Sequence, residues 1–309
     1  MNNAFINIKK VNCDLCGGQK ADLLYKMPDL RYWTSEQEYS VVQCQNCGHR
    51  HLNPRPVPED IRKCYPEHYH NFRSQDISKQ QERYARQSSY FGKLPPGRFL
   101  DIGCAKGAFC ETMMESGWDC YGMDLFDQPV HELPKDLKFK SGDIREADYP
   151  DNYFDGISSW GVFEHLTSPK RYFMEVERIL KPNGLFVIMV PNGNSLWSRY
   201  AYKDDIPRHL QFFTPDSINK YAEISNLKIV DIDYTNRIYS MPATGRDCFR
   251  ISFLKWAGVP WSKINEPQTK LHLKILSYFG SAMGSLLIHP SIEEILKLSG
   301  IMVVKFTKD

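Results

Sequence analysis

Apolar and polar residues alternate over residues 98–192 in blocks that are typical of strands and helices in turn. Five short, largely apolar blocks predict strands: RFLDIGC, DCYGMDL, LKFKSGD, FDGISSWGV and GLFVIMVPN. Helices are expected from Ala108 onward, over 169–180 and over 215–225. Two further strands follow later in the chain: LKIVDIDY and IMVVKFTK. This alternation predicts an α/β fold with a parallel sheet that is covered on both faces.

The pattern changes on either side of this region, and the predicted domains follow these changes. Residues 1–55 predict a small ribbon in which EYSVVQC forms a strand. Residues 56–97 follow as a linker interrupted by prolines and then a leading helix. The α/β domain takes residues 98–240 and returns for its last strand at 300–309. Between these parts, residues 241–299 predict an apolar helical insertion that acts as a lid, a dimer contact or a membrane-proximal element.

Four of the nine cysteines form two matched pairs, CDLCGG and CQNCGH. Two thiolates of one tight turn can reach a single metal ion, and two such turns complete a tetrahedral site. The sequence therefore predicts a structural zinc site, with buried metal-free cysteines or a redox pair as the alternatives. The predicted ligands are Cys13, Cys16, Cys44 and Cys47. We expect His49 and His51 at the surface or beside the ligands, because four thiolates already saturate zinc.

The run FLDIGCAKGAF predicts a ligand site at the start of a helix. An apolar strand that carries Asp101 is followed by a turn with Gly103 and Gly107, which brings the backbone close to a ligand. Asp124 ends the next predicted strand, where a carboxylate can accept hydrogen bonds from both hydroxyls of a ribose. An adenosine-containing ligand is expected.

Composition narrows the choice of partner. The chain has 309 residues, 42% of them apolar, which is ample for a buried core. Lys and Arg number 39 against 37 Asp and Glu, so the net charge of +2 gives no electrostatic argument for a nucleic-acid partner. The first residues contain no apolar signal segment, and five cysteines show no pairing pattern. We therefore expect a cytoplasmic protein.

Residues 98–235 and the final strand resemble class I S-adenosylmethionine-dependent methyltransferases of the small-molecule type. The motifs match in order: the glycine loop, Asp124, GDI, FDGISSWGVFEHL, RILKPNG and VIMVPN. The resemblance implies a Rossmann-like, seven-stranded, mostly parallel sheet with an antiparallel last strand, and S-adenosyl-L-methionine as cofactor. The residues that it implies at the cofactor are Asp101, Gly103, Ala105, Gly107, Asp124, Leu125, Asp143, Ile144 and Trp160.

The same resemblance implies roles for these residues. Asp101 orients the turn or meets the methionyl amine, and Trp160 lies beside the sulfonium. Asp143 accepts a hydrogen bond from the adenine amino group, and Ile144 packs on the ring. A turn or cap role is the alternative for Asp143. Ala105 replaces the second glycine of the family's GxGxG, which alanine can do if its φ is negative.

A narrower resemblance joins the ribbon to the α/β domain. The order of two cysteine pairs, NPRP, YPEHY and a methyltransferase is similar to that in methyltransferases of sugar nucleotide and polysaccharide biosynthesis, including sugar C-methyltransferases. In those C-methyltransferases a histidine of a short HEH-like stretch is the base, and His209 lies at a comparable place, preceded by Arg208 instead of an acidic residue. They also carry a long C-terminal domain that 309 residues cannot accommodate. We therefore expect methylation of a hydroxyl oxygen rather than of carbon.

His209 is the candidate general base, because a neutral imidazole can take the acceptor's proton at neutral pH. A core or capping role is the alternative for His209, and a structural role is the alternative for the second candidate, His165. A further aromatic and imidazole cluster either closes over the acceptor or packs at a domain junction. Its members are Tyr65, His68, Tyr69 and His70.

The predicted partner is a small-molecule acceptor, with nucleotide-linked and lipid-linked sugars as candidates. Peripheral membrane contact and a homodimer stay open for residues 241–299. Two other function classes remain: a zinc-ribbon RNA methyltransferase, and a catalytically silent binding protein on the same fold. Basic runs interleaved with aromatic residues are missing from the sequence, which argues against the first. The intact Asp124, Asp143 and Gly103 argue against the second.

Overall fold

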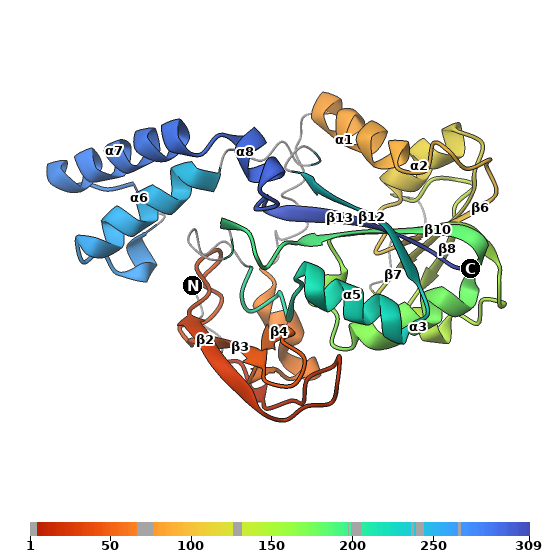
Figure 1. Cartoon of the computed structure of the whole chain (residues 1–309), viewed down its shortest axis with the longest axis horizontal. Helices are drawn as coiled ribbons and strands as arrows, with labels where there is room; N and C mark the ends of the chain where they lie inside the picture. The colour runs from red at the N-terminus through yellow and green to blue at the C-terminus, as the bar shows by residue number, and fades with distance from the viewer. Residues whose placement is uncertain are drawn as a thin grey trace. The chain divides into compact units, whose positions relative to one another are not determined.

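The computed structural model forms two compact units, each assembled from three stretches of the chain (Figure 1). The ribbon unit comprises residues Met1–Phe72, Pro191–Ser217 and Tyr234–Met302. The sheet unit comprises Arg73–Val190, Ile218–Asp233 and Val303–Asp309. The residues described by the structure are 5–66, 77–125, 132–196, 198, 205–235, 238, 244–264 and 267–309.

The sheet unit is built on seven strands, as the apolar blocks predicted. The strands are β6 (Arg98–Ile102), β7 (Asp119–Asp124), β8 (Lys138–Ser141), β9 (Phe154–Trp160), β10 (Leu180–Pro191), β12 (Lys228–Thr235) and β13 (Ile301–Thr307). They lie in the order β12-β13-β10-β9-β6-β7-β8. All neighbours from β10 to β8 pair in parallel. The order steps outward from β6 in both directions, so the carboxyl ends of β6 and β9 lie at the point where the winding reverses.

The last strand runs against the others. Asn192, just after β10, donates its amide to the carbonyl of Gly300, just before β13, over 2.9 Å. At the opposite end, the amide of Asn183 donates to the carbonyl of Lys308 over 2.8 Å. The start of β13 therefore lies beside the end of β10, which makes the pair antiparallel. The predicted fold class, a mostly parallel α/β sheet with an antiparallel last strand, is confirmed.

Helices cover both faces of this sheet, as the alternating pattern predicted (Figure 1). On one face lie α1 (Ile77–Ser89) and α2 (Ala108–Glu115), and on the other lie α3 (Pro169–Ile179) and α5 (Pro215–Ile224). Aromatic rings fill both layers. The first layer contains Phe91, Phe99, Phe109 and Trp118, and the second contains Phe163, Phe173, Phe186, Tyr221 and Phe306. Because this packing occupies the two faces of the sheet, the predicted site lies at the carboxyl ends of the parallel strands.

The ribbon unit contains two small antiparallel sheets. One has the order β11-β4-β3-β2 and the other pairs β1 with β5. Their strands are β1 (Ile8–Lys9), β2 (Ala21–Met27), β3 (Tyr39–Cys44), β4 (Arg50–Leu52), β5 (Arg55–Pro56) and β11 (Gln211–Phe212), and a 3₁₀ helix η1 (Pro58–Cys64) follows β5. The strand predicted from EYSVVQC is β3. The edge strand β11 comes from far along the chain and extends the ribbon's sheet.

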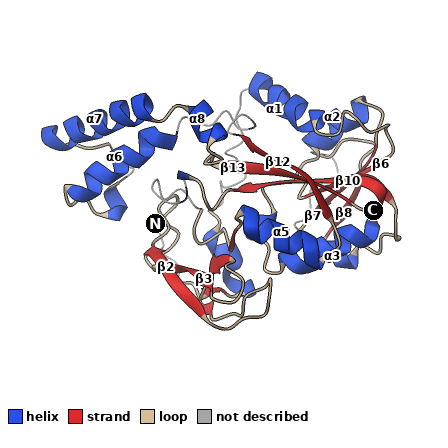
Figure 2. Cartoon of the chain, in the orientation of Figure 1, coloured by secondary structure: helices blue, strands red, loops and turns tan. Residues whose placement is uncertain are grey.

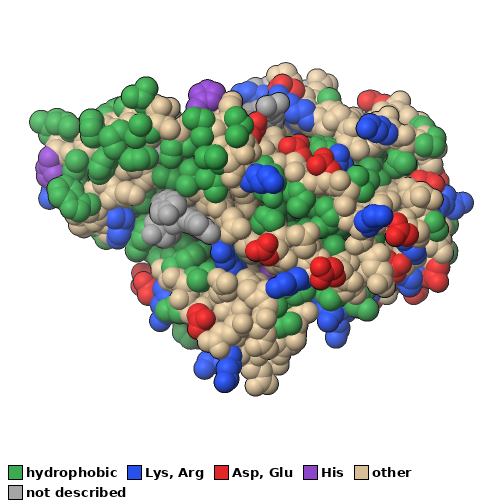
Figure 3. Space-filling model, in the orientation of Figure 1, with side chains coloured by type: hydrophobic (Ala, Val, Ile, Leu, Met, Phe, Trp, Pro, Cys, Tyr) green, Lys and Arg blue, Asp and Glu red, His purple; other side chains and the backbone are tan. Residues whose placement is uncertain are grey.

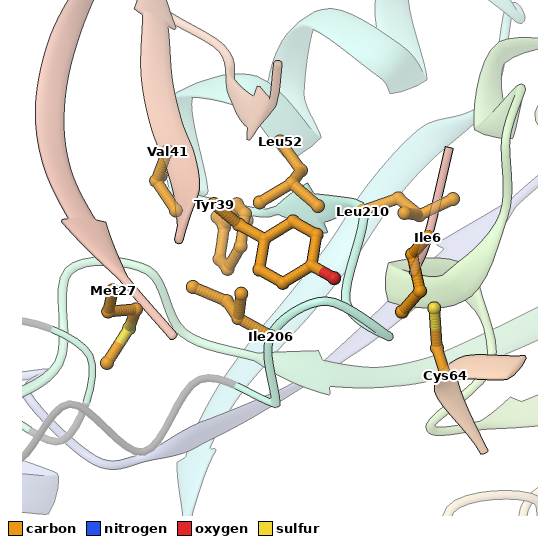
Figure 4. Packing of buried hydrophobic residues seen from close by; sticks show 9 residues of the cluster. Ile6, Met27, Tyr39, Val41, Leu52, Cys64, Ile206 and Leu210 are labelled. Carbon is orange, nitrogen blue, oxygen red and sulfur yellow. The ribbon is translucent and has the colours of Figure 1, made fainter. Parts of the chain in front are cut away.

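The core of the ribbon unit explains why this distant segment belongs to it. Ile206 and Leu210 are buried against Tyr39 and Leu52 (Figure 4). Each of these four side chains is at most 2% exposed. The segment that carries β11 therefore completes the ribbon's hydrophobic core. The domain boundaries predicted from the sequence stay predictions, but residues 205–217 pack with the ribbon.

Residues 244–264 and 267–300 form a largely helical part of the ribbon unit. Helices α6 (Thr244–Trp256) and α7 (Leu271–Leu287) pack side by side, and α8 (Pro290–Ile295) follows (Figure 2). A short 3₁₀ helix, η6 (Trp261–Lys263), lies between the first two. None of the helices in the described ranges is long and apolar enough to cross a membrane.

Candidate active site and metal centre

The predicted cofactor residues gather at one edge of the sheet. Gly103 follows β6, Asp124 ends β7, Asp143 follows β8 and Trp160 ends β9. These four strands are neighbours and run in parallel, so their carboxyl ends meet at the same edge. Ligands of open α/β sheets bind in a crevice outside this edge. The fold therefore brings together residues that are spread over about sixty positions of sequence.

The turn after β6 depends on glycine at two positions. Gly103 has φ +79° and Gly107 has φ +73°, a region that favours glycine. A Cβ on Gly103 would lie 2.3 Å from a methyl group of Val162. A Cβ on Gly107 would lie 2.6 Å from a methyl group of Leu137. Both glycines are therefore required by the turn and its packing, and Gly107 is the N-cap of α2.

The backbone of Ala105 does not meet the condition under which alanine was expected to replace glycine. A negative φ would have accommodated alanine, but the observed φ is +48°. The backbone adopts this left-handed conformation because the turn directs the Ala105 amide to the Asp124 carboxylate, which accepts its hydrogen bond at 3.0 Å. The contact ties the β6 turn to the end of β7. Alanine therefore occupies a conformation that glycine would adopt at lower cost.

Asp101 is an internal support of the turn. Its carboxylate is 3% exposed and accepts a hydrogen bond from the Ser158 hydroxyl at 2.6 Å. Ser158 lies on β9, directly paired with Asp101 on β6. On the next pair of this ladder, the Ser159 hydroxyl donates to the carbonyl of Ile102 over 3.1 Å. Two buried serines therefore fix the carboxyl end of β6 against β9.

Asp143 caps the short helix η4 (Ile144–Glu146). Its carboxylate accepts hydrogen bonds from the amide of Arg145 at 3.0 Å and from two guanidinium nitrogens of Arg145 at 2.8 and 2.7 Å. Burial alone would raise the pKa of Asp143, but the hydrogen bonds and charge of Arg145 hold that pKa below its ordinary value. The cap role left open by the sequence is thus observed, and Ile144 is buried beside it. The adenine contact stays a prediction.

Trp160 carries the observation that best fits a bound cofactor. Its indole N–H is buried and has no hydrogen-bond partner among the residues that the structure describes. Phe109 and Tyr90 pack against the ring, with centroids 5.6 and 6.1 Å away. A buried donor without an acceptor is costly, and an acceptor atom of a ligand at this edge would satisfy it. Leu125, beside Asp124, is 55% exposed and offers apolar surface at the same edge.

The two candidate bases lie in different units. His165 ends the 3₁₀ turn η5 (Phe163–His165), which follows β9 in the sheet unit. His209 lies in the ribbon unit, just before β11, and is half-buried. Its amide donates to the carbonyl of Asp205 over 2.8 Å, and its Nδ1 accepts from the Asp205 amide over 3.4 Å. These bonds hold the imidazole in a tight turn.

The four predicted metal ligands converge. Every pair of their sulfur atoms lies within 4.8 Å, and the Cys13–Cys47 and Cys16–Cys44 sulfurs are 3.5 Å apart. A tetrahedral zinc site with Zn–S bonds of about 2.3 Å requires sulfurs about 3.8 Å apart. Each pair sits in a turn that glycine completes, Gly17 at φ +73° and Gly48 at φ +74°. The donor set and its spacing therefore fit zinc.

His49 and His51 are buried rather than at the surface, which corrects one of the two placements expected for them. They are 0% and 3% exposed. His49 lies against Phe213, and its Nε2 is 2.9 Å from Gln211 Oε1. Since the amide oxygen accepts, His49 donates through Nε2. Burial lowers the pKa of His49 to about 4, so the ring is neutral at neutral pH. The buried part of the ribbon therefore extends beyond its cysteines, because β11 covers His49.

A buried charge cluster in the ribbon unit was missed by the sequence analysis. The Arg208 guanidinium, 2% exposed, donates to Asp29 at 2.7 and 2.9 Å and to Asp205 at 2.8 Å. It also donates to the carbonyl of Cys64 at 2.6 Å. Burial alone would raise the pKa of both carboxyls, but Arg208, together with His209 in the case of Asp205, lowers them below their ordinary values. We call Arg208, Asp29 and Asp205 the arginine clamp.

Arg208, the residue before His209, is the centre of the arginine clamp. Arg208 stands where the narrower resemblance implied an acidic residue, and its side chain is directed to Asp29, 179 positions earlier. The signal in the sequence was this departure itself, but no spacing rule links Arg208 to Asp29. Of the predicted aromatic and imidazole cluster, Tyr65 packs against the ribbon core. His68, Tyr69 and His70 lie outside the described residues.

Comparisons with known proteins agree with this geometry. Residues 69–232, more than half of the chain, match a family described as a methyltransferase domain. A ubiquinone biosynthesis O-methyltransferase of Bradyrhizobium diazoefficiens is 28% identical over 178 residues, which are 52% of this chain and 67% of that one. A sterol 24-C-methyltransferase of Pneumocystis carinii is 31% identical over 140 residues, 40% of this chain and 36% of that one. The chain thus spans about two thirds or less of the length of these relatives.

A solved structure is similar in fold. It is a chain of the complex between the Haloferax volcanii Trm112 methyltransferase activator and a methyltransferase. The superposition covers 78% of this chain and 96% of that chain, with a TM-score of 0.50 and 14% identity. At this identity the likeness concerns the fold of the chain alone.

Proposed function

The chain belongs to the family of S-adenosylmethionine-dependent methyltransferases, and we propose that it methylates a hydroxyl oxygen of a small-molecule acceptor. The observation that carries the proposal is the set of residues at the carboxyl edge of β9, β6, β7 and β8, with the unpartnered Trp160 indole among them. S-adenosylmethionine supplies an electrophilic methyl group on a sulfonium sulfur. The protein's own contribution is to hold both reactants in line and to remove a proton.

Each cofactor residue has a proposed task that its environment supports. Asp124 accepts from the ribose hydroxyls, and its contact with the Ala105 amide keeps the carboxylate in place. Ile144 packs on the adenine and Asp143 accepts from its amino group, while Arg145 holds the Asp143 carboxylate ionised. Asp101 supports the turn from beneath, since it is already bonded to Ser158.

His209 is the proposed general base. Its Nδ1 takes the proton, because in the neutral ring Nδ1 carries the lone pair that accepts the 3.4 Å bond from the Asp205 amide. Deprotonation of the acceptor hydroxyl produces an imidazolium on the enzyme, and a nearby carboxylate stabilises that charge. Asp205 provides the carboxylate, since the attraction between the two residues is among the causes that lower the Asp205 pKa. The arginine clamp keeps Asp205 ionised. His165, on the turn after β9, is the alternative base, and it lies in the unit that carries the cofactor residues.

The finer acceptor class is a sugar or glycan hydroxyl, on the strength of the ribbon that precedes the methyltransferase domain. The name of one relative, a ubiquinone biosynthesis O-methyltransferase, supports a second candidate, a lipid-soluble hydroxyl compound. Both acceptor classes are small molecules, so both require a pocket rather than the basic groove that a nucleic acid would need. The net charge of +2 agrees with that requirement.

The test separates cofactor binding from proton removal. Purified protein is titrated with S-adenosylmethionine by calorimetry, and methyl transfer is followed with sugar nucleotides, lipid-soluble phenols and RNA as acceptors. For Asp124→Asn we expect cofactor affinity to fall about 10- to 100-fold, the cost of one or two charge-assisted hydrogen bonds. For His209→Gln we expect unchanged cofactor affinity and a kcat reduced about 100-fold or more.

His165→Gln is the matched control for His209→Gln. Loss of kcat in the His165 variant, with full activity in the His209 variant, would assign the base to the sheet unit. Methyl transfer to RNA but to no small molecule would contradict the proposed acceptor. Absence of cofactor binding in the wild-type protein would contradict the enzyme assignment itself.

A further inference from the structure

Helix α7 uses one of its faces to pack against α6. Gly280 and Gly284, one turn apart, are buried on this face. A Cβ on Gly280 would lie 2.9 Å from the Arg250 backbone, so the two helices approach closely. Phe253 of α6 stacks near Phe279, with ring centroids 5.9 Å apart. This small-residue face is fully used by the helix pair.

The opposite face of α7 is apolar and exposed. Leu271, Ile275, Tyr278 and Leu286 recur at helical spacing, and their exposed fractions range from 59% to 84%. Hydrophobic atoms gather over α6 and α7 in the space-filling view (Figure 3). The exposed apolar side chains continue into the next helix and onto the end of α6. We call the whole set the apolar stripe: Leu271, Ile275, Tyr278, Leu286, Leu287, Ile292, Ile295, Leu296 and Trp256. A stripe of this size marks an interaction surface.

The charges around the stripe are mostly positive. From Pro267 through Ile292 the sequence contains no Asp or Glu, while Lys270 and Lys274 flank the stripe on α7. Glu293 and Glu294 lie among the α8 members of the stripe, and Glu293 is buried. A second copy of the chain, docked stripe to stripe, would bring the two lysines of each copy together and offer them one half-buried carboxylate, Glu294. An anionic surface offers negative charge along its whole extent. Charge complementarity therefore favours an anionic partner over self-association.

We propose that the apolar stripe docks on the surface of an anionic lipid bilayer, with α7 lying in the plane of the interface. None of the described helices can cross a membrane, and a helix of 17 residues with one apolar face and a basic flank is suited to the interface. Tyr278 and Trp256, 78% and 82% exposed, are the side-chain types that settle at the level of lipid headgroups. Lys270 and Lys274 then contact anionic headgroups.

The test is cosedimentation of the full chain with lipid vesicles. One vesicle preparation is phosphatidylcholine alone, and the other is an equimolar mixture with phosphatidylglycerol. We expect the chain to sediment with the anionic vesicles, and binding to weaken at high ionic strength. Two double variants probe the two contributions: Ile275→Ser with Leu286→Ser, and Lys270→Glu with Lys274→Glu. Each should reduce the bound fraction about tenfold, because interfacial anchoring needs both apolar burial and charge.

Met174→Ser is the matched control, because Met174 is an exposed apolar side chain on a helix of the other unit. It should bind vesicles as the wild type does. All four replaced side chains are exposed, and circular dichroism checks that the variants remain folded. Wild-type protein that ignores anionic vesicles would overturn the proposal. A concentration-dependent dimer without lipid that the stripe variants abolish would also overturn it, in favour of a second copy.

Discussion

The predicted cofactor site, which we call the crevice, and the cysteine ribbon use the same kind of turn but assemble over different ranges of sequence. Gly103 and Gly107 shape the crevice, and Gly17 and Gly48 shape the ribbon, all at φ between +73° and +79°. The crevice residues all follow consecutive strands of one sheet. In the ribbon, by contrast, Arg208 reaches back 179 positions to Asp29, and Gln211 reaches back 162 positions to His49.

This difference separates what a motif can specify from what only the folded chain can. A glycine turn carries its conformational requirement within a few residues, so its position predicts the site. A buried ion pair has no such local requirement, because either partner could lie anywhere in the chain. The ribbon unit is thus defined locally by its cysteines and completed by contacts from a distant segment. Substitutions can test whether the two parts of the ribbon depend on each other.

Metal removal is expected to have the largest effect. In Cys44→Ser one of four thiolate ligands is lost, and structural zinc contributes roughly 10–16 kcal/mol of binding free energy in zinc-finger peptides. We expect zinc content to fall from one ion per chain to none. Hydrogen exchange should show loss of protection in β2 and β3, and S-adenosylmethionine affinity should change less than about threefold, as for an independent unit. Elemental analysis, exchange and calorimetry measure the three quantities.

Cys64→Ser is the control for metal removal. Cys64 is buried in the same unit but lies outside the four-thiol cluster. It should retain zinc and protection in β2 and β3. A Cys44→Ser protein that loses cofactor affinity along with zinc would mean that the crevice is not independent of the ribbon.

Breaking the arginine clamp is expected to have the next largest effect. Arg208→Met leaves the Asp29 carboxylate buried without its cation and leaves Asp205 with the more distant Arg31, 3.7 Å away, which costs about 3–5 kcal/mol in the free energy of unfolding. In the wild type both carboxyls have pKa values below their ordinary range. Their contribution to stability is therefore present above the unfolded pKa of about 3.9 and is lost as the pH falls through the folded values. Burial without Arg208 raises these pKa values in the variant, so the stability difference between wild type and variant should narrow as the pH falls from the raised values to the lowered values of the wild type.

The matched control breaks an exposed ion pair instead. Lys138 pairs with Asp119 at 2.6 Å, with both side chains about half exposed. Lys138→Met should cost at most about 1 kcal/mol. Chemical denaturation from pH 3 to 8 compares the variants. An Arg208→Met cost as small as that of Lys138→Met would show that the distant segment contributes little to the ribbon.

The sequence predicted the fold and the turn that follows β6 better than the ribbon's interior, and the reason is physical. Seven strands, the start of α2 and the convergence of four thiols follow from periodicity, turn chemistry and ligand spacing, all of which act over short distances. The burial of His49 depends on β11, a two-residue strand that no periodicity could reveal. The sequence offered a cap role as one alternative for Asp143. The hydrogen bond that its carboxylate accepts from the Arg145 guanidinium could be found only from the structure.

The smallest effect is expected at Ala105, where the crevice departs from its motif. Alanine at φ +48° is disfavoured relative to glycine, so Ala105→Gly should raise the free energy of unfolding of the sheet unit by about 1 kcal/mol. The amide that donates to Asp124 is present in both residues, so cofactor affinity should stay within about twofold. Thermal unfolding with and without S-adenosylmethionine measures both quantities.

Asn226→Gly provides the comparison for Ala105→Gly, because Asn226 has φ +55° but belongs to a residue type that tolerates this region. It should stabilise the unit by less than Ala105→Gly does. If Ala105→Gly instead raises cofactor affinity about tenfold or more, the alanine methyl group obstructs the ligand. Alanine at this position would then lower the affinity for the cofactor. An unchanged affinity would mean that the β6 turn tolerates alanine because its key contact, to Asp124, is made by the backbone.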